Sequence, residues 1–138
     1  MPELDSNGFV AFFQALWGKS PFAWQKALAS RVLADALIPN PSTTGGREAK
    51  AGWPDAIALP TAAGKTACMD IAVYALAAQA GRLDEGKPFT MPRRIFFVVD
   101  RRVIVDEAFE RARCLAMRLQ SAQDGIVKEI ADRLRRLA

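Results

Sequence analysis

Residues 57–66 read Ile-Ala-Leu-Pro-Thr-Ala-Ala-Gly-Lys-Thr, and this stretch combines the residue types that hold a nucleotide phosphate. A glycine lets the backbone approach a phosphate closely, because Gly64 has no Cβ. Lys65 can reach the β- and γ-phosphates, and the Thr66 hydroxyl can bind Mg²⁺. Backbone N–H groups at a helix N-terminus add a favourable environment for an anion. The pattern predicts a site for ATP and Mg²⁺, with a chance Gly-Lys-Thr at a loop–helix junction as the alternative.

The residues expected to contact the nucleotide in this loop are Thr61, Ala62, Ala63, Gly64, Lys65, Thr66 and Ala67. Lys65 is the expected catalytic cation and Thr66 the expected metal ligand. Leu59 stands where the strict phosphate-loop pattern has its first glycine. The form Pro-Thr-x-x-Gly-Lys-Thr is typical of superfamily 2 helicases and translocases.

A second candidate, Gln25, lies in Pro-Phe-Ala-Trp-Gln at residues 21–25. A glutamine amide can donate to N7 of adenine and accept from its N6 amino group, and a neighbouring aromatic ring can stack on the purine. The alternative is a solvated Gln25 beside a core tryptophan, Trp24. The sequence therefore offers Gln25 as an adenine contact.

A third candidate is the pair Arg101 and Arg102, which follows an apolar run ending at Asp100. Two arginines near a helix N-terminus suit the phosphate oxygens of DNA. Asp100 can alternatively be a Walker B carboxylate that holds Mg²⁺. A Walker B residue in this class is followed by glutamate, whereas Arg101 follows here, so the DNA contact is favoured over it. Solvated arginines are the third possibility.

The elements that must position these residues alternate between helix and strand. Apolar periodicity predicts helices at about 6–17, from Pro21 to about residue 38, and then at 65–80, 102–122 and after Asp124. Short apolar runs predict strands at 55–59 and 94–100. We expect an α/β fold, a partial RecA-like P-loop NTPase lobe whose parallel sheet has flanking helices. Residues 1–54 form N-terminal helices and a linker, and residues 55–138 the first, incomplete part of the lobe.

Composition further narrows the kinds of site and the location that we expect for this protein. The chain has 138 residues, a net charge of +4 and no histidine, so histidine catalysis and histidine metal sites are excluded within it. The two cysteines lie in apolar helical patterns and suit reduced thiols. No apolar run is long and uncharged enough to span a membrane, and no signal peptide is apparent. We expect a cytoplasmic protein without a membrane partner.

Together these motifs resemble the helicase-nuclease of type I CRISPR systems, most closely that of subtype I-G (formerly I-U). The resemblance lies in Pro-Phe-x-Trp-Gln (21–25), Trp-Pro (53–54), the phosphate loop (59–67) and the run from Arg93 to Ala108. Val-Asp-Arg-Arg-Val-Ile-Val-Asp, at 99–106, is its most distinctive part.

The resemblance implies a prokaryotic superfamily 2 motor of antiviral defence, coupled to a metal-dependent HD nuclease. Such a motor is recruited to a crRNA-guided surveillance complex and moves along single-stranded DNA using ATP. Gln25 would contact adenine, Gly64, Lys65 and Thr66 the phosphates and Mg²⁺, and the pair Arg101–Arg102 the DNA.

The motor's Asp-Glu-x-His motif, Ser-Ala-Thr motif, second lobe and HD pair are not found in this sequence. ATP binding is therefore expected of this chain without useful hydrolysis. Three alternatives stay open: another superfamily 2 translocase such as a restriction-type motor, a compact P-loop kinase or transferase using Asp100, and a nucleotide-regulated interaction module.

Overall fold

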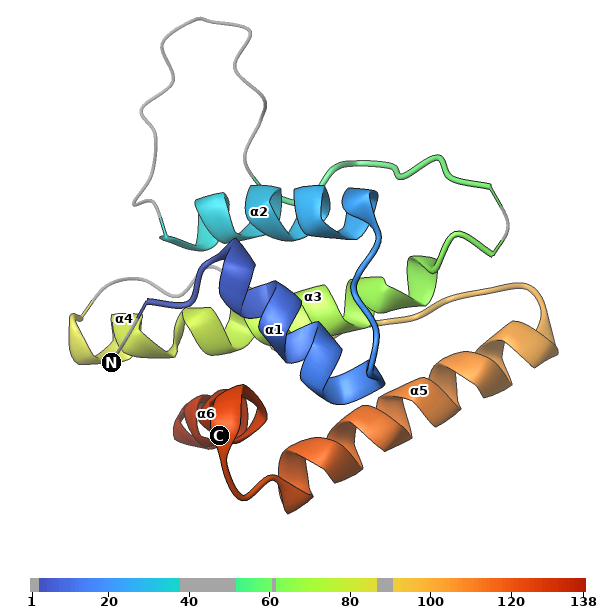
Figure 1. Cartoon of the computed structure of the whole chain (residues 1–138). Coiled ribbons are helices and arrows are strands. Elements are labelled where there is room, and N and C mark those ends of the chain that lie inside the picture. The colour runs from blue at the N-terminus through green and yellow to red at the C-terminus, as the bar shows by residue number, and fades with distance from the viewer. Residues whose placement is uncertain (1–2, 38–51, 61, 87–90) are drawn as a thin grey trace, which may run out of the picture.

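The computed structural model describes residues 3–37, 52–60, 62–86 and 91–138, and the regular elements within them are all helical (Figure 1). In chain order they are α1 (Ser6–Trp17), α2 (Ala23–Leu37), the 3₁₀ helix η1 (Lys65–Ala67), α3 (Cys68–Ala78), α4 (Ala80–Asp84), α5 (Arg102–Ser121) and α6 (Gly125–Leu137).

Helix α1 shows how local sequence fixes an element. The Asp5 carboxylate accepts a hydrogen bond from the Gly8 amide at 2.8 Å and caps the N-terminus. Gly18 ends the helix in the left-handed conformation, with φ 68°, and its N–H donates to the Gln14 carbonyl at 2.8 Å. Between these caps, the apolar residues recur every three or four positions and are buried: Phe9, Phe12, Phe13 and Leu16.

The core is built around α3, which packs against α2 on one side and α6 on the other, while α1 contacts all three. Many of the α3 side chains are alanines, which allow helices to approach closely. Tyr74 of α3 is buried against the rings of Phe9 and Phe12, and its hydroxyl donates to the Asp5 carbonyl at 2.9 Å. This contact ties the start of α1 to the middle of α3.

The expected parallel sheet of a RecA-like lobe is wrong for this structure, because no strand occurs among the described residues. The segments 55–59 and 94–100 have no regular structure and run as coil on the outside of the helices (Figure 1). A strand is defined by backbone hydrogen bonds to a neighbour. Within the described chain, neither segment makes a backbone hydrogen bond. The apolar runs therefore have strand-like composition without a ladder.

The helices were predicted better than the sheet. Those expected at 6–17, at 102–122 and after Asp124 match α1, α5 and α6. The helix expected over 65–80 begins with η1 and breaks at Gln79, between α3 and α4. Most of the expected linker falls at 38–51, outside the described residues.

None of the helices in the described ranges has both the length and the apolar character needed to cross a membrane. Both cysteines, Cys68 and Cys114, are free and half-buried.

Candidate functional site

The loop that precedes η1 has an unusual backbone. Ala62 has φ 64° and Gly64 has φ 76°, so two left-handed residues flank Ala63. Glycine adopts this conformation readily, whereas an alanine there is strained. The Ala63 N–H donates to the Pro60 carbonyl at 3.3 Å, which closes a tight turn. Alternating left-handed residues of this kind turn successive N–H groups to one side of the chain, as anion-binding nests do.

The amides at this turn are available to a ligand. The N–H groups of Gly64, Lys65 and Thr66 donate to no acceptor within the described chain, whereas the next amide, Ala67, bonds to the Gly64 carbonyl at 3.1 Å. The first N–H groups of a helix have no partner inside it, and an anion can supply one. The residues present therefore fit a phosphate group.

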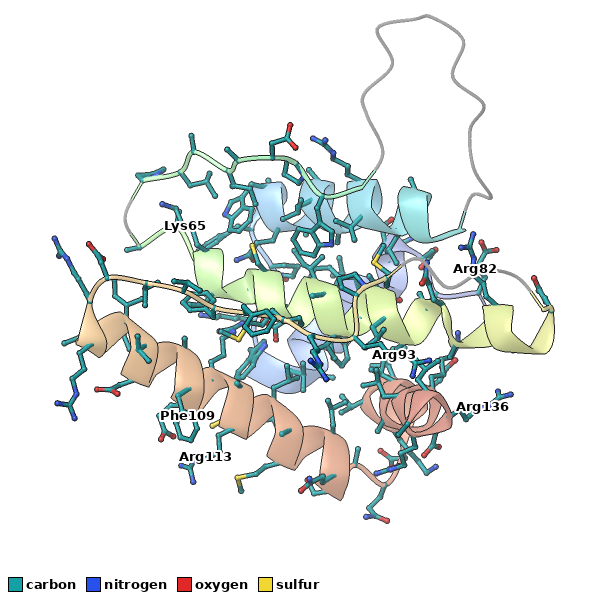
Figure 2. The ribbon with its side chains drawn as sticks, turned by 180° about the vertical axis from the view of Figure 1, so that it is seen from behind. Lys65, Arg82, Arg93, Phe109, Arg113 and Arg136 are labelled. Carbon is teal, nitrogen blue, oxygen red and sulfur yellow. The ribbon has the colours of Figure 1, made fainter. Side chains whose placement is uncertain are left out.

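Lys65 and Thr66 lie where the sequence places them, at the start of η1. The Lys65 side chain is exposed, points away from the helical core (Figure 2) and forms no ion pair with any described residue. Thr66 is half-buried. Thr61, also expected to contact the nucleotide, lies outside the described residues.

The structure brings two sequence motifs together at this loop. Trp24 donates its indole N–H to the Ala63 carbonyl at 2.8 Å, and Gln25 donates its amide to the Gly64 carbonyl at 3.0 Å. Each pair is separated by 39 residues in the chain. The start of α2 thus holds the phosphate-loop backbone by two side-chain hydrogen bonds.

Gln25 is almost fully buried, with an exposed fraction of 2%. Its Oε1 accepts from the Phe22 N–H at 2.8 Å while its Nε2 donates to Gly64. An amide has two donor hydrogens and two acceptor lone pairs, so each atom keeps one further hydrogen bond to make. A Cβ built on Gly64 would lie 2.7 Å from Nε2 of Gln25, so glycine is needed here for space as well as conformation.

The two aromatic residues beside Gln25 differ in role. Trp24 is half-buried and fixed to Ala63, so its ring supports the loop. Phe22 is 54% exposed, and its ring comes within 3.2 Å of the Cβ position built at Gly64. Phe22 is therefore the aromatic ring that has a free face next to the loop.

Arg101 and Arg102 are both exposed at the N-terminus of α5, where Arg101 is the N-cap residue. The N-terminal ends of α3 and α5 lie at the same end of the molecule (Figure 1). Asp100 is exposed too and accepts no hydrogen bond from the described residues. The described part of the chain contains no cluster of three or more acidic or cysteine side chains that could hold a metal ion. Thr66 is therefore the one expected Mg²⁺ ligand that the loop offers, and water and phosphate oxygens would have to complete the shell.

A second concave feature lies on the α5 side of α3. It is an apolar groove of about 520 Å³ between α3, residues 93–97 and α5. Several of its side chains are well exposed, including Phe109 at 64% and Ile95 at 49%. Arg93 is the one charged side chain in its lining, which is otherwise apolar.

Sequence reasoning missed a buried ionic cluster. Asp70 of α3 has no exposed surface and is bonded by Arg111 of α5 and Trp17 of α1. Burial raises the pKa of Asp70, and the donors from Arg111 and Trp17 act in the opposite direction. One signal could have found it: Asp70 is the only charged residue between Lys65 and Arg82, in a segment that is otherwise apolar.

In comparisons with known proteins, no protein-family model, curated protein or solved structure matches the chain. The chemistry of the site must therefore be inferred from the contacts around the loop. Those contacts are the paired carbonyls of Ala63 and Gly64, the free amides that follow, and the exposed Lys65.

Proposed function

We propose that this chain binds ATP with Mg²⁺ through the loop at 61–67 and serves as the ATP-binding portion of a motor that moves on single-stranded DNA. The observation that carries the proposal is the joining of two motifs by the Trp24–Ala63 and Gln25–Gly64 hydrogen bonds. The sequence suggested nucleotide chemistry for each motif separately. If the Gly-Lys-Thr sequence were a chance match, there would be no reason to expect the Gln25 motif to contact it.

In this proposal each residue has a distinct part. The amides of Gly64, Lys65 and Thr66 donate to phosphate oxygens, and the Lys65 ammonium neutralises charge on the β- and γ-phosphates. Mg²⁺ bound with the nucleotide would be held by the Thr66 hydroxyl and would neutralise negative charge on the phosphates. Phe22 stacks on the adenine, and Gln25, which is almost fully buried, holds the loop through its hydrogen bonds with Phe22 and Gly64.

ATP binding is tested directly by titrating the chain with a fluorescent ATP analogue in the presence of Mg²⁺. We expect Lys65→Ala to weaken binding by about tenfold or more, equivalent to about 1.4 kcal/mol. Lys26→Ala is the matched control, because Lys26 is exposed on α2 beside Gln25 and its side chain forms no hydrogen bond or ion pair with the described residues of the loop. Equal affinity of both variants and wild type would refute the phosphate site.

The DNA part of the proposal depends on Arg101 and Arg102 and on the resemblance to CRISPR-associated helicase-nucleases, whose crRNA-guided complex is the proposed partner. Fluorescence anisotropy with a single-stranded oligonucleotide tests it. Replacing both arginines with alanine should weaken binding and reduce the salt dependence of the affinity. Arg113→Ala, on the same helix and also exposed, should have little effect.

A second candidate is a P-loop kinase or transferase in which Asp100 binds Mg²⁺. It is favoured only by the position of Asp100 at the end of an apolar run. It predicts that Asp100→Ala abolishes Mg²⁺-dependent nucleotide binding. The motor proposal predicts that Asp100→Ala leaves nucleotide affinity nearly unchanged.

A further inference from the structure

The apolar segment at residues 94–100 leads from the core to α5 without any hydrogen bond to the described chain. Both of its ends are fixed. Before it, the Met91 N–H donates to Oε1 of Gln79 at 2.8 Å, and after it the Arg101 carbonyl accepts from the Ile104 N–H at 3.1 Å. No proline interrupts the segment, so each of its residues has a backbone donor and acceptor to offer. Unpaired backbone groups of this kind are a template for a strand from another chain.

The side chains of the segment alternate between two environments. Ile95 and Phe97 line the apolar groove between α3 and α5, whereas Phe96 and Val98 lie outside its lining and are the two most exposed large apolar side chains of the described chain. Alternation with a period of two is the pattern of a strand that has one covered face. In Figure 2 the segment crosses in front of α3, and no other described element is drawn over it. The segment therefore has the side-chain order of a strand and an open outer face.

The charges at the two ends of the segment make it complementary to itself. It begins with Arg94 and ends with Asp100, which are both exposed and form no ion pair within the described chain. If two copies run antiparallel with Phe97 facing its own counterpart, Arg94 of one copy faces Asp100 of the other. In the same register Phe96 faces Val98, an aromatic and β-branched pair that stabilises neighbouring strands. Twofold symmetry forms each of these contacts twice.

Other registers of the two copies fit less well. Residues that face each other across a strand pair lie on the same side of the sheet, so only a shift by an even number of residues keeps the exposed faces together. The nearest such shift in one direction places Arg94 opposite Val98. The nearest in the other direction places it opposite Arg102, and like charges in facing positions are destabilising. The sequence of the segment therefore favours one register.

We propose that two copies of this chain associate by antiparallel pairing of residues 94–100, with Phe97 at the twofold axis. This inference does not depend on the proposed nucleotide or DNA site. The interface is isologous, because each copy contributes the same segment. A stable interface commonly buries about 800 Å² on each partner, which is more than one short strand supplies, so the dimer forms only at high protein concentration.

Sedimentation equilibrium of the purified chain over a range of concentrations tests the proposal. Wild type should show an equilibrium between monomer and dimer without larger species. Arg94→Asp and Asp100→Arg each place like charges opposite each other at both ends of the paired segments. Each variant should therefore raise the dissociation constant of the dimer by about tenfold or more.

A mixture of these two variants gives the sharpest prediction. In a dimer with one copy of each, the new aspartate of one copy faces the new arginine of the other, and the unchanged Asp100 faces the unchanged Arg94. An equimolar mixture should therefore dimerise about as well as wild type, although neither variant does so alone. The double variant, with both charges exchanged in one chain, should also dimerise about as well as wild type.

Asp106→Arg and Arg113→Asp are the matched controls, because they make the same charge reversals at exposed positions of α5 outside the segment. Both should keep the wild-type dissociation constant. Since Arg94 and Asp100 are exposed and make no hydrogen bond within the described chain, their substitution should leave the fold intact, which circular dichroism checks.

Four outcomes would overturn the proposal. Wild type could stay monomeric at every concentration, which is the result expected if a different protein covers the segment, or it could assemble beyond the dimer. The mixture of the two variants could stay monomeric, or the controls could weaken association as much as the variants in the segment. None of these measurements uses nucleotide or DNA, so their result is separate from that of the proposed function.

Discussion

The side chains of α1 and those of residues 95–109 end in opposite environments, although both stretches are rich in phenylalanine and aliphatic residues. Phe9, Phe12 and Leu16 have no exposed surface. Phe96 is 82% exposed and Val98 is 89% exposed. Apolar character makes burial favourable, but burial also needs a surface to pack against. α1 has α2, α3 and α6 beside it, whereas residues 95–98 lie along a groove that is only partly filled.

The same difference explains what the sequence could and could not predict. The boundaries of α1, α5 and α6 follow mainly from a local signal, the spacing of apolar residues, so they were predicted nearly to the residue. A sheet depends on hydrogen bonds between segments far apart in the chain. The composition of 94–100 is that of a strand, but its neighbours decide whether a strand forms.

The candidate site divides in a similar way. The loop at 62–67 and Gln25 were recognisable from residue types and spacing, and the structure brings them together. The use of Trp24 as a donor to the Ala63 carbonyl could not be predicted, because its spacing suits a core residue equally well. The buried ionic cluster was missed because Asp70, Arg111 and Trp17 come from three separate helices.

The largest contrast between the two regions should appear when the same substitution is made in each. We expect Phe12→Ala to lower the free energy of unfolding by about 3–5 kcal/mol, because it leaves a cavity in the core. Phe96→Ala should change it by less than about 0.5 kcal/mol, since that ring contacts mostly solvent. Urea unfolding of both variants provides the measurement. Similar losses at the two positions would mean that residues 95–98 are buried in solution.

Replacing two left-handed glycines, Gly64 in the loop and Gly18 at the end of α1, tests how tightly the loop is held. Gly18→Ala adds a Cβ with nothing within 4 Å, so it should cost about 1–2 kcal/mol from backbone strain alone. Gly64→Ala adds the same strain and also places its Cβ 2.7 Å from Nε2 of Gln25. We expect Gly64→Ala to cost about 1 kcal/mol more than Gly18→Ala, through the lost hydrogen bond to Gln25. Equal costs in thermal or urea unfolding would show that Gln25 does not support the loop.

Tyr74, the only tyrosine in the sequence, provides a pH test of the core. Burial, and secondarily the charge of Asp5, raises the pKa of Tyr74. The folded pKa therefore lies above the unfolded value of about 10, so the stabilisation is fully present below about pH 10 and is lost as pH rises above it. The free energy of unfolding should fall as the pH rises above about 10. Tyr74→Phe should show a smaller fall, and phenolate absorbance should appear only on unfolding. Phenolate absorbance in the folded protein near pH 10.5 would contradict this burial.

The smallest expected change in stability is for substitutions in the exposed segment at residues 95–98. Replacing Phe96 with serine and Val98 with threonine should leave the free energy of unfolding within about 0.5 kcal/mol of wild type. The same double variant should bind less of a hydrophobic dye, because it removes two of the most exposed apolar side chains. Unchanged dye binding would locate the accessible apolar surface elsewhere, for example at Phe109 and Met117.

The central claim, that the amides after Ala63 bind a nucleotide phosphate, is tested most directly by following backbone amide resonances in a ¹⁵N-labelled sample during a titration with Mg²⁺ and ATP. We predict that the resonances of Gly64, Lys65 and Thr66 shift strongly. The left-handed glycines Gly18 and Gly125, which lie outside the loop, should stay in place. Shifts confined to other parts of the chain, or no shift at any of the three loop amides, would contradict the account.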